Sequence, residues 1–391
     1  MVVVGASLGG LRAADALVRA GYPGEVTLIG EEPHYPYNRP PLSKEALVAN
    51  HDFERIRLRS SAKAGAYRVM LGTRVERADL SRGELHLSDG TSLGFDGLIA
   101  ASGLRSRALG IPKPPGGVLS LRSYDDLLSL RAQLGGVTKV VIVGAGFIGC
   151  ELAASLTTLG LQVTVIAPEE VPMLRPLGHD LGAAIQSRHQ RHGVHFALER
   201  LPVAIEGELG PSAVICDDGS RFEAQLVIEA VGSNTNVEWL QDNGLDLSDG
   251  VACNEKLQFA GHPNCFAVGD IARFPNLLFD GVARRVEHWG IAVDSGRHAG
   301  KALASVLRSN EPVQEFRPMP AFWSDQFDLR IQSFGMPGLV QEGASIRVIE
   351  GDLADEVAVG YYREEILVGV VLLGMAQSHN KYRKILADNL A

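Results

Sequence analysis

The chain contains the same pattern of strand, glycine turn and helix twice, and this duplication constrains its fold more than any other feature. The segment VVVGASLGGLRAADALVRAG begins at Val2, and VVIVGAGFIGCELAASLTTLG begins at Val140. In each copy an apolar run enters a glycine-rich turn, after which apolar residues recur at helical spacing. A β-branched run, VTLIG or VTVIA, follows each helix. The sequence therefore predicts two βαβ units.

The repetition continues beyond these units, and a different pattern follows it. SDGTSLGFDGLIAASG, from Ser88, is similar to DDGSRFEAQLVIEAVG, from Asp217, and each predicts two strands joined by an Asp-Gly turn. Whole domains are thus expected to be duplicated. After about Glu315, the strand-like runs SIRVIEG, EVAVGYY and ILVGVVLLG and the helical KYRKILADNL predict a small α+β domain.

The glycine turns indicate dinucleotide binding. A strand that enters a helix through close-packed glycines directs backbone N–H groups and the positive end of the helix dipole toward a diphosphate. The second copy matches GxGxxG fully, whereas the first has serine at the middle position. The six residues are Gly5, Ser7 and Gly10, and Gly144, Gly146 and Gly149. A turn without ligand is the alternative for a single copy, but two copies in register favour binding.

An acidic residue after the second strand of such a unit normally binds ribose hydroxyls, and Glu31 has this place in the first copy. The second copy differs, because Ala167 stands at the strand end and is followed by Glu169 and Glu170. No Arg or Lys in that short stretch would hold a 2′-phosphate, so NADH is expected rather than NADPH, with Glu169 or Glu170 as the ribose acceptor. Arg175 follows on a flexible loop and leaves this choice open.

Two dinucleotide units in one chain indicate a tightly held FAD and a passing nicotinamide, since hydride transfer requires the two rings in contact. FAD is expected at the first turn. Asp270, in VGDIARF, follows a predicted buried strand, where its carboxylate would accept a hydrogen bond from a ribityl hydroxyl. The alternative for Asp270 is a solvated turn.

Lys44 and Glu151 are the candidate catalytic residues. Lys44 follows two prolines that stiffen its loop, so its ammonium could be held near the flavin and favour the reduced, anionic ring. Glu151 lies two residues after Gly149 and would orient Lys44 where the cofactors meet. A favourable contact with the helix dipole is an equally good explanation of Glu151.

Composition excludes several classes of function. The net charge is -9 and no long basic run occurs, which argues against a nucleic-acid partner. The four cysteines are scattered and lack the spacing of a metal site, which favours a cytoplasmic location. No secretory leader is expected, because the chain opens directly on a strand. The longest apolar run, from Ile366 to Ala376, is too short for a membrane span and is interpreted as a buried strand.

Eight segments, taken in order, closely resemble the bacterial ferredoxin reductases, the NADH-dependent flavoproteins that serve haem monooxygenases and ring-hydroxylating dioxygenases. They are GASLGGLRAADAL, EEPHYPYNRPPLSK, AASG, VGAGFIGCELAASL, VGSNTNVEWL, AVGDIARF, RRVEHW and FWSDQFDLRIQSFG. The resemblance covers essentially the whole chain, and it rests on the order and spacing of the segments. It implies an α/β fold with two Rossmann-like nucleotide-binding domains, of the glutathione-reductase type, and a C-terminal α+β domain.

The organisation of the chain places domain boundaries near residues 110, 232 and 315, and the resemblance implies what each domain binds and which residues form the site. Residues 1–110 and 233–315 would bind FAD, residues 111–232 would bind NADH, and residues 316–391 would form the C-terminal domain. Lys44 and Glu151 would pair beside the isoalloxazine. The family's FAD-contact motifs fall on Arg39, Ser102, Asp270 and Trp289, and the aromatic near the ring is Trp323. Three positions depart from the family pattern: Ser102 replaces threonine, Thr235 replaces proline, and Ala167 replaces glutamate.

The function implied is transfer of hydride from NADH to FAD and then of single electrons to a [2Fe-2S] or similar ferredoxin that serves an oxygenase. The absence of CxxC near Pro40–Lys44 separates the chain from related disulfide reductases. Alternatives are another acceptor, such as rubredoxin, dioxygen or a quinone, or a signalling flavoprotein like the apoptosis-inducing factors. An arginine-rich segment is the candidate ferredoxin-docking surface, although a solvated helix face explains it equally well: Arg273, Arg284, Arg285, Arg297, Lys301 and Arg308.

Overall fold

The computed structural model describes residues 1–308, 312–340 and 345–390. The chain forms two compact units, each assembled from separate segments. The first unit contains Met1–Asn38, Arg57–Arg105 and Thr235–Phe322, and the second contains Arg39–Ile56, Ser106–Asn234 and Trp323–Ala391. The short strands β8 (Leu104–Ser106) and β17 (Ser233–Thr235) lie where the sequence passes from one unit to the other.

The first unit is built on a six-stranded sheet. Its strands, in spatial order, are β19 (Gln258–Phe259), β20 (His262–Ala267), β7 (Leu98–Ala100), β1 (Val2–Val4), β2 (Thr27–Ile29) and β3 (Arg68–Met70). The central strand β1 pairs in parallel with both β2 and β7, and all three residues of β1 are buried. Because β20 pairs in parallel with β7, distant parts of the chain complete one sheet.

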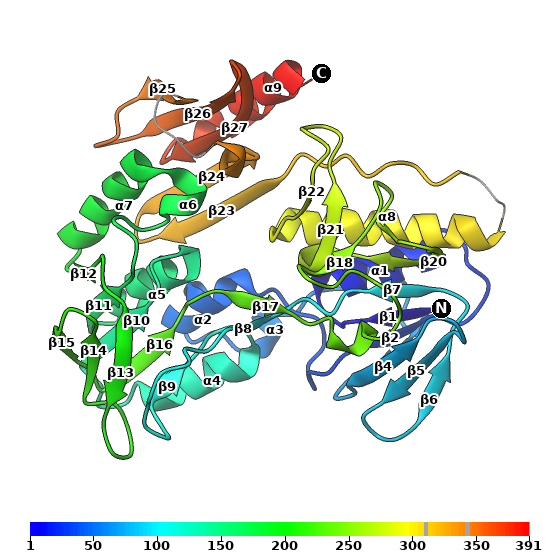
Figure 1. Cartoon of the computed structure of the whole chain (residues 1–391), viewed down its shortest axis with the longest axis horizontal. Helices are drawn as coiled ribbons and strands as arrows, with labels where there is room; N and C mark the ends of the chain where they lie inside the picture. The colour runs from blue at the N-terminus through cyan, green and yellow to red at the C-terminus, as the bar shows by residue number, and fades with distance from the viewer. Residues whose placement is uncertain (309–311, 341–344, 391) are drawn as a thin grey trace. The chain divides into compact units, whose positions relative to one another are not determined.

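Two long helices pack against each other in the first unit, α1 (Leu8–Arg19) and α8 (Trp289–Arg308), as Figure 1 shows. Glycines in α8 permit this close approach. A Cβ at Gly296 would lie 2.4 Å from the Gly9 carbonyl oxygen, and one at Gly300 would lie 2.4 Å from that of Ala13. A side chain at either position would therefore force the two helices apart.

Two small sheets and two 3₁₀ turns complete the first unit. One sheet contains β4 (Val75–Asp79), β5 (Glu84–Leu87) and β6 (Ser92–Gly94), and the other contains β18 (Val251–Ala252), β21 (Ala272–Pro275) and β22 (Ala283–Arg285). The turns are η2 (Glu238–Leu240) and η3 (Gly269–Ile271). The turn η3 follows β20 after Val268 and contains Asp270.

The second unit contains a five-stranded parallel sheet. Its strands, in spatial order, are β12 (His195–Ala197), β11 (Gln162–Ile166), β10 (Lys139–Val143), β16 (Leu226–Glu229) and β9 (Val118–Leu119). Helices α4 (Tyr124–Gln133), α5 (Phe147–Thr158), α6 (Leu174–Leu177) and α7 (His179–Arg191) belong to the same unit, with the antiparallel strands β13 (Pro202–Glu206), β14 (Ala213–Cys216) and β15 (Arg221–Glu223). The short elements η1 (Pro40–Ser43), α2 (Glu45–Val48) and α3 (Phe53–Ile56) precede them in sequence.

The C-terminal part of the chain forms a second five-stranded sheet. Its strands, in spatial order, are β23 (Ala321–Gln326), β24 (Leu329–Gly335), β27 (Ile366–Leu373), β26 (Val357–Arg363) and β25 (Ile346–Gly351), with η4 (Pro337–Leu339), η6 (Ala376–Ser378) and α9 (His379–Leu390). Helix α9 buries Tyr382 and Leu386. The apolar run that begins at Ile366 is a strand buried along most of its length, as predicted. Among the helices of the described residues, none has both the length and the apolar character needed to cross a bilayer.

Candidate functional site

The first glycine turn has a backbone that only glycine fits. Gly5 has a φ of 116°, and a Cβ there would lie 2.1 Å from the carbonyl oxygen of Ala101. A Cβ at Gly10 would lie 2.0 Å from the carbonyl oxygen of Gly5. Ser7 is the N-cap of α1, yet its hydroxyl makes no capping hydrogen bond. The first N–H groups of α1 thus remain available to an anion.

The second turn repeats this geometry. Gly144 has a φ of 110°, and a Cβ there would lie 2.3 Å from the carbonyl oxygen of Ala230. A Cβ at Gly149 would lie 2.0 Å from the oxygen of Gly144. Gly146 differs, because no atom lies within 4 Å of its ideal Cβ position. Packing therefore does not require glycine at residue 146, and the open space beside it fits the close approach of a diphosphate.

The acidic residues expected to bind ribose lie just beyond the strands, as predicted. Glu31 is exposed and follows β2, whereas Glu169 is partly buried and Glu170 is exposed beyond the end of β11. The guanidinium of Arg175 lies 3.8 Å from Glu169 Oε1, and the Arg175 side chain is 88% exposed. Arg175 lies in the short helix α6, not in the flexible loop expected from the sequence, and Glu169 balances part of its positive charge.

The other predicted residues of the first unit are Ser102, Trp289 and Asp270, and each lies in a different local environment. The Ser102 hydroxyl donates to the carbonyl oxygen of Asn236, and it accepts a bond of 3.3 Å from the indole N–H of Trp239. The indole N–H of Trp289 donates to Asn38 Oδ1 over 2.8 Å. Asp270 is partly buried in η3. Ser102 therefore joins two distant parts of the chain, a structural role that the sequence did not reveal.

Lys44 and Glu151 are brought together in the second unit. The distance between Lys44 Nζ and Glu151 Oε2 is 2.8 Å. Lys44 follows η1, while Glu151 is the fifth residue of α5, just beyond its first turn, so the short PPLS turn and the helix that follows the glycine turn position the pair. The pair predicted from the sequence is present, and its action on a flavin stays a prediction.

The Glu151 carboxylate accepts two further hydrogen bonds, which sequence reasoning missed. Ser43 Oγ donates to Glu151 Oε2 over 2.5 Å, and Ser324 Oγ donates to Glu151 Oε1 over 2.6 Å. Both serines are buried. Because Ser43 is adjacent to Lys44 in the sequence, its contact with Glu151 could have been predicted. Nothing in the sequence links Ser324 to α5.

Arg39 and Trp323 are the remaining predicted contacts. The Arg39 guanidinium donates to the carbonyl oxygen of Arg122 over 2.6 Å. Trp323 is partly buried on β23, and side chains alternate between the two faces of a strand. The indole of Trp323 therefore projects from the face of β23 opposite to that of Ser324.

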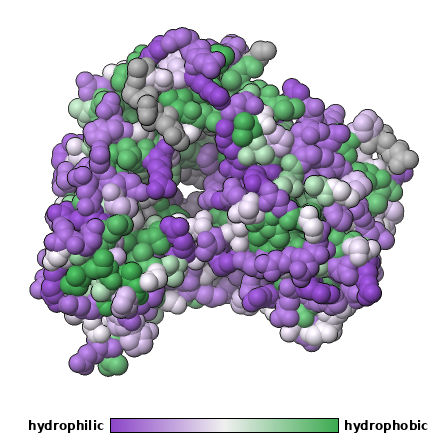
Figure 2. Space-filling model, in the orientation of Figure 1, coloured by the Kyte–Doolittle hydropathy of each residue, from purple (hydrophilic) through white to green (hydrophobic). Residues whose placement is uncertain are grey.

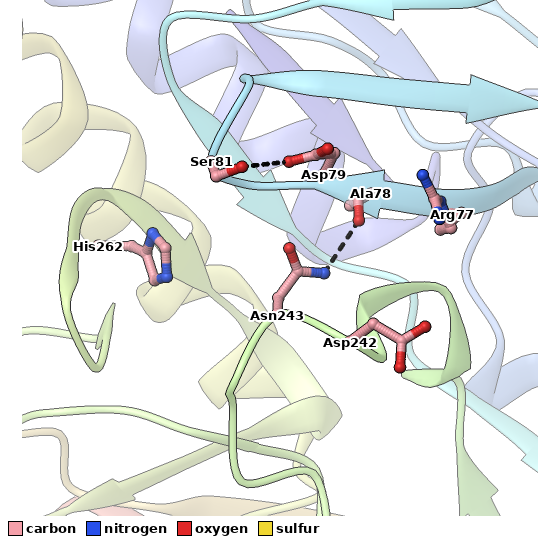
Figure 3. A pocket seen from close by; sticks show the side chains of 7 residues that line it. All are labelled: Arg77, Ala78, Asp79, Ser81, Asp242, Asn243 and His262. Carbon is pink, nitrogen blue, oxygen red and sulfur yellow. Dashed lines mark hydrogen bonds between the residues drawn. The ribbon is translucent and has the colours of Figure 1, made fainter.

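A cavity of about 300 Å³ in the first unit contains none of the predicted residues (Figure 3). Its lining is polar and comes from β4 and from the loops near η2 and β20: Arg77, Ala78, Asp79, Ser81, Asp242, Asn243 and His262. Ser81 Oγ donates to Asp79 Oδ1 over 2.7 Å, and Asn243 Nδ2 donates to the Ala78 carbonyl oxygen over 2.9 Å. These bonds link neighbouring segments of the lining, and we interpret the cavity as a crevice between packed loops.

Comparison with known proteins identifies the family. Residues 1–296 match the model described as pyridine nucleotide-disulphide oxidoreductase, and residues 321–391 match the model described as reductase C-terminal. Rhodocoxin reductase of Rhodococcus erythropolis is 32% identical over 395 residues, which cover 100% of this chain and 90% of that protein. The chain belongs to the ferredoxin reductases of this family.

Other ferredoxin reductases support this identification. The ferredoxin–NAD(+) reductase component of the anthranilate 1,2-dioxygenase system of Burkholderia cepacia is 34% identical, over 90% of this chain and 85% of that protein. The crystal structure of the ferredoxin reductase for the CYP199A2 system of Rhodopseudomonas palustris has a TM-score of 0.91 and 30% identity, and covers 99% of this chain and 94% of that one. The resemblance, the oxidoreductase class and the predicted fold class are confirmed.

The arginine-rich segment of this ferredoxin reductase carries less free positive charge than its sequence implies. Three of its cations are paired with carboxylates: Arg273 with Asp246, Arg284 with Asp280, and Arg285 with Asp249 and Glu287. Figure 2 shows hydrophilic and hydrophobic residues interspersed over the visible face of the molecule. The ion pairs favour the alternative of a solvated surface.

Proposed function

We propose that this ferredoxin reductase oxidises NADH and reduces a [2Fe-2S] or similar ferredoxin that serves an oxygenase, with FAD as its bound cofactor. The observation that carries the proposal is the pair of duplicated glycine turns, each with the backbone geometry of a diphosphate site. When bound, FAD accepts a hydride pair and gives up electrons singly, which is the conversion that a one-electron iron–sulfur carrier requires.

The first unit would hold FAD through its glycine turn and the residues around it. The N–H groups at the start of α1 would bind the diphosphate, with Ser7 adding its hydroxyl, which makes no capping hydrogen bond. Glu31 would accept hydrogen bonds from ribose, and Asp270 would accept one from the ribityl chain. Ser102 and Trp289 are proposed as further contacts from the resemblance to the family.

The second unit would hold NADH on the turn that contains Gly144, Gly146 and Gly149, with Glu169 or Glu170 accepting from the ribose hydroxyls. Arg39, Lys44 and Trp323 are proposed FAD contacts, again from the resemblance. Glu151 holds the Lys44 ammonium at a fixed point, and a fixed cation stabilises negative charge on a reduced ring without reorganisation. The buried setting of the pair strengthens this effect.

An anaerobic titration of the purified protein with NADH tests the proposal. We expect a bound yellow chromophore that NADH bleaches with a stoichiometry of about one, and NADPH to be the poorer donor. Colourless protein, or a chromophore that NADH leaves oxidised, would contradict the proposal. A panel of a [2Fe-2S] ferredoxin, a rubredoxin, a quinone and dioxygen, compared by initial rate, then identifies the acceptor.

We also propose a cytoplasmic location. The cysteines Cys150, Cys216, Cys253 and Cys265 are free thiols, and burial raises the pKa of Cys253 and of Cys265 to about 12. Buried thiols of this kind need no oxidising compartment. Fractionation of the native cells with an antibody to this chain tests the location.

A further inference from the structure

A chain of buried hydrogen bonds runs from the Lys44–Glu151 pair into the C-terminal sheet. Ser324 donates to Glu151, and Gln326 Nε2 lies 3.0 Å from Ser324 Oγ. Gln326 Oε1 in turn lies 2.8 Å from His189 Nε2 on α7. Ser324, Gln326 and His189 are each no more than 1% exposed. Of these three residues, only Ser324 contacts Glu151, and Gln326 and His189 extend the chain beyond the site described above.

The chemistry of the groups sets the direction of this chain. A serine hydroxyl has one hydrogen, and a carboxylate is its strongest acceptor here, so Ser324 donates to Glu151. Its oxygen must then accept from the amide nitrogen of Gln326. The amide oxygen of Gln326 consequently faces His189, whose Nε2 must carry a hydrogen. Burial lowers the pKa of His189 to about 4, which agrees with a neutral ring that has its one hydrogen on Nε2.

The two oxygens of Glu151 have different partners. Oε2 accepts from Ser43 and pairs with Lys44, whereas the bond that Oε1 accepts comes from Ser324. The Ser43 carbonyl oxygen is itself held by Ser155 Oγ over 2.6 Å. Without Ser324 the Oε1 atom would be a buried acceptor with no other donor among the described residues, and the carboxylate would lose the contact that fixes its rotation.

We infer that Ser324 and Gln326 are positioning residues for the Lys44–Glu151 pair. Strand β23 thereby sets the orientation of the Glu151 carboxylate, and through it the place of the Lys44 ammonium. The C-terminal sheet then contributes to reduction of the flavin, although its residues Ser324 and Gln326 act only through Glu151. This inference rests on the proposed function, because it requires Lys44 to act on the flavin.

The test compares variants of the FAD-loaded enzyme by stopped-flow reduction with NADH and by the flavin midpoint potential. For Ser324→Ala we expect flavin reduction to slow by about tenfold, the value of one hydrogen bond to a charged group, and the potential to change. Ser324→Thr keeps the hydroxyl and should restore reduction to within about twofold of the wild type. Gln326→Met, which removes the next link, should slow reduction less than Ser324→Ala does.

Ser333→Ala is the matched control. Ser333 is also fully buried in the C-terminal sheet, on β24, but its hydroxyl has no hydrogen-bond partner among the described residues. This variant should match the wild type in rate and potential. Flavin content and thermal unfolding are measured for every variant. They distinguish a variant that has lost its structure from one in which only the Lys44–Glu151 pair is displaced. If Ser324→Ala fails to fold, Gln326→Met carries the same comparison.

Two results overturn different claims. If Lys44→Met slows reduction while Ser324→Ala and Gln326→Met match Ser333→Ala in rate and potential, the positioning role is wrong and the proposed function stands. If Lys44→Met itself leaves rate and potential unchanged, the role of the pair on the flavin is wrong. Reduction that is slow in Ser324→Ala and recovers in Ser324→Thr supports the inference.

Discussion

The Lys44 ammonium and the Glu151 carboxylate form an ion pair that is nearly closed to solvent, with side chains that are 11% and 8% exposed. Removing one member of such a pair leaves a buried charge without its partner. Loss of stability and loss of activity can therefore occur together, and experiments on this pair must measure both.

We expect Glu151→Gln to destabilise the protein by about 3–5 kcal/mol, because Lys44 would keep a buried charge without its carboxylate. Lys44→Met should cost less, since Glu151 retains Ser43 and Ser324 as donors. Urea unfolding measures the difference. Equal stability of the two variants would contradict this account of the pair. Flavin reduction by NADH should slow by about tenfold or more in both.

Alanine substitutions in the glycine turns should affect either stability or NADH binding, depending on whether the glycine is closely packed. Gly5→Ala and Gly144→Ala each place a Cβ within 2.3 Å of a carbonyl oxygen at positive φ, so we expect severe destabilisation. Gly146→Ala meets open space and should fold normally. Its methyl group would instead obstruct the diphosphate and raise the Kd for NADH about tenfold.

The contrast between these variants is measured by thermal unfolding and by NADH titration of the same preparations. Gly135→Ala, at another glycine with open space around its Cβ position, is the control for the substitution itself. If Gly146→Ala binds NADH as the wild type does, the diphosphate does not approach residue 146.

Glu169 should help to determine the choice of nicotinamide. Because its carboxylate lies 3.8 Å from the Arg175 guanidinium, Glu169→Gln would release that cation to bind a 2′-phosphate. We expect the ratio of kcat/KM for NADPH to that for NADH to rise about tenfold. The double variant Glu169→Gln, Arg175→Leu should return to the original ratio. A ratio that Glu169→Gln leaves unchanged would remove Arg175 from the recognition of the cofactor.

Stability should fall as the pH is lowered from about 6.5 to about 4, in part because of His189. Its pKa lies near 4 in the folded chain, compared with 6.5 ordinarily, so the unfolded state binds the proton more readily in this range. The full effect is at most about 3 kcal/mol and is present only above pH 6.5. In His189→Leu the dependence on pH in this window should be shallower. An unaltered slope would show that His189 already accepts a proton in the native state.

The parts of the site that the sequence predicts are those where one local rule decides the conformation. Gly5 and Gly144 need positive φ, and Lys44 and Glu151 follow rigid or glycine-rich turns. Ser324 could not be assigned in this way, because its contact with Glu151 joins residues 173 positions apart through the path of β23.

The surface charge of the arginine-rich segment was also hard to predict, because two of its ion pairs join residues that are far apart in the sequence. Arg273 and Arg285 lie in an apparently basic segment, but Asp246 and Asp249 reach them from an earlier loop. Spacing along the chain does not reveal such pairs, since side-chain charge acts through space. The domain bounds predicted from the repeat stay a prediction, whereas the strand, turn and helix order of both units follows from hydrophobic period and glycine placement.

The contact between Gly296 and Gly9 has a consequence for biosynthesis. Helix α8 packs against the start of α1, next to the first glycine turn, and β20 completes the sheet whose strand β1 precedes that turn. When only about the first hundred residues of the chain have been synthesised, the elements that stabilise the conformation of this turn are therefore still absent. If the first turn binds FAD as proposed, we expect the ribosome-bound chain to take up flavin only after α8 has left the exit tunnel.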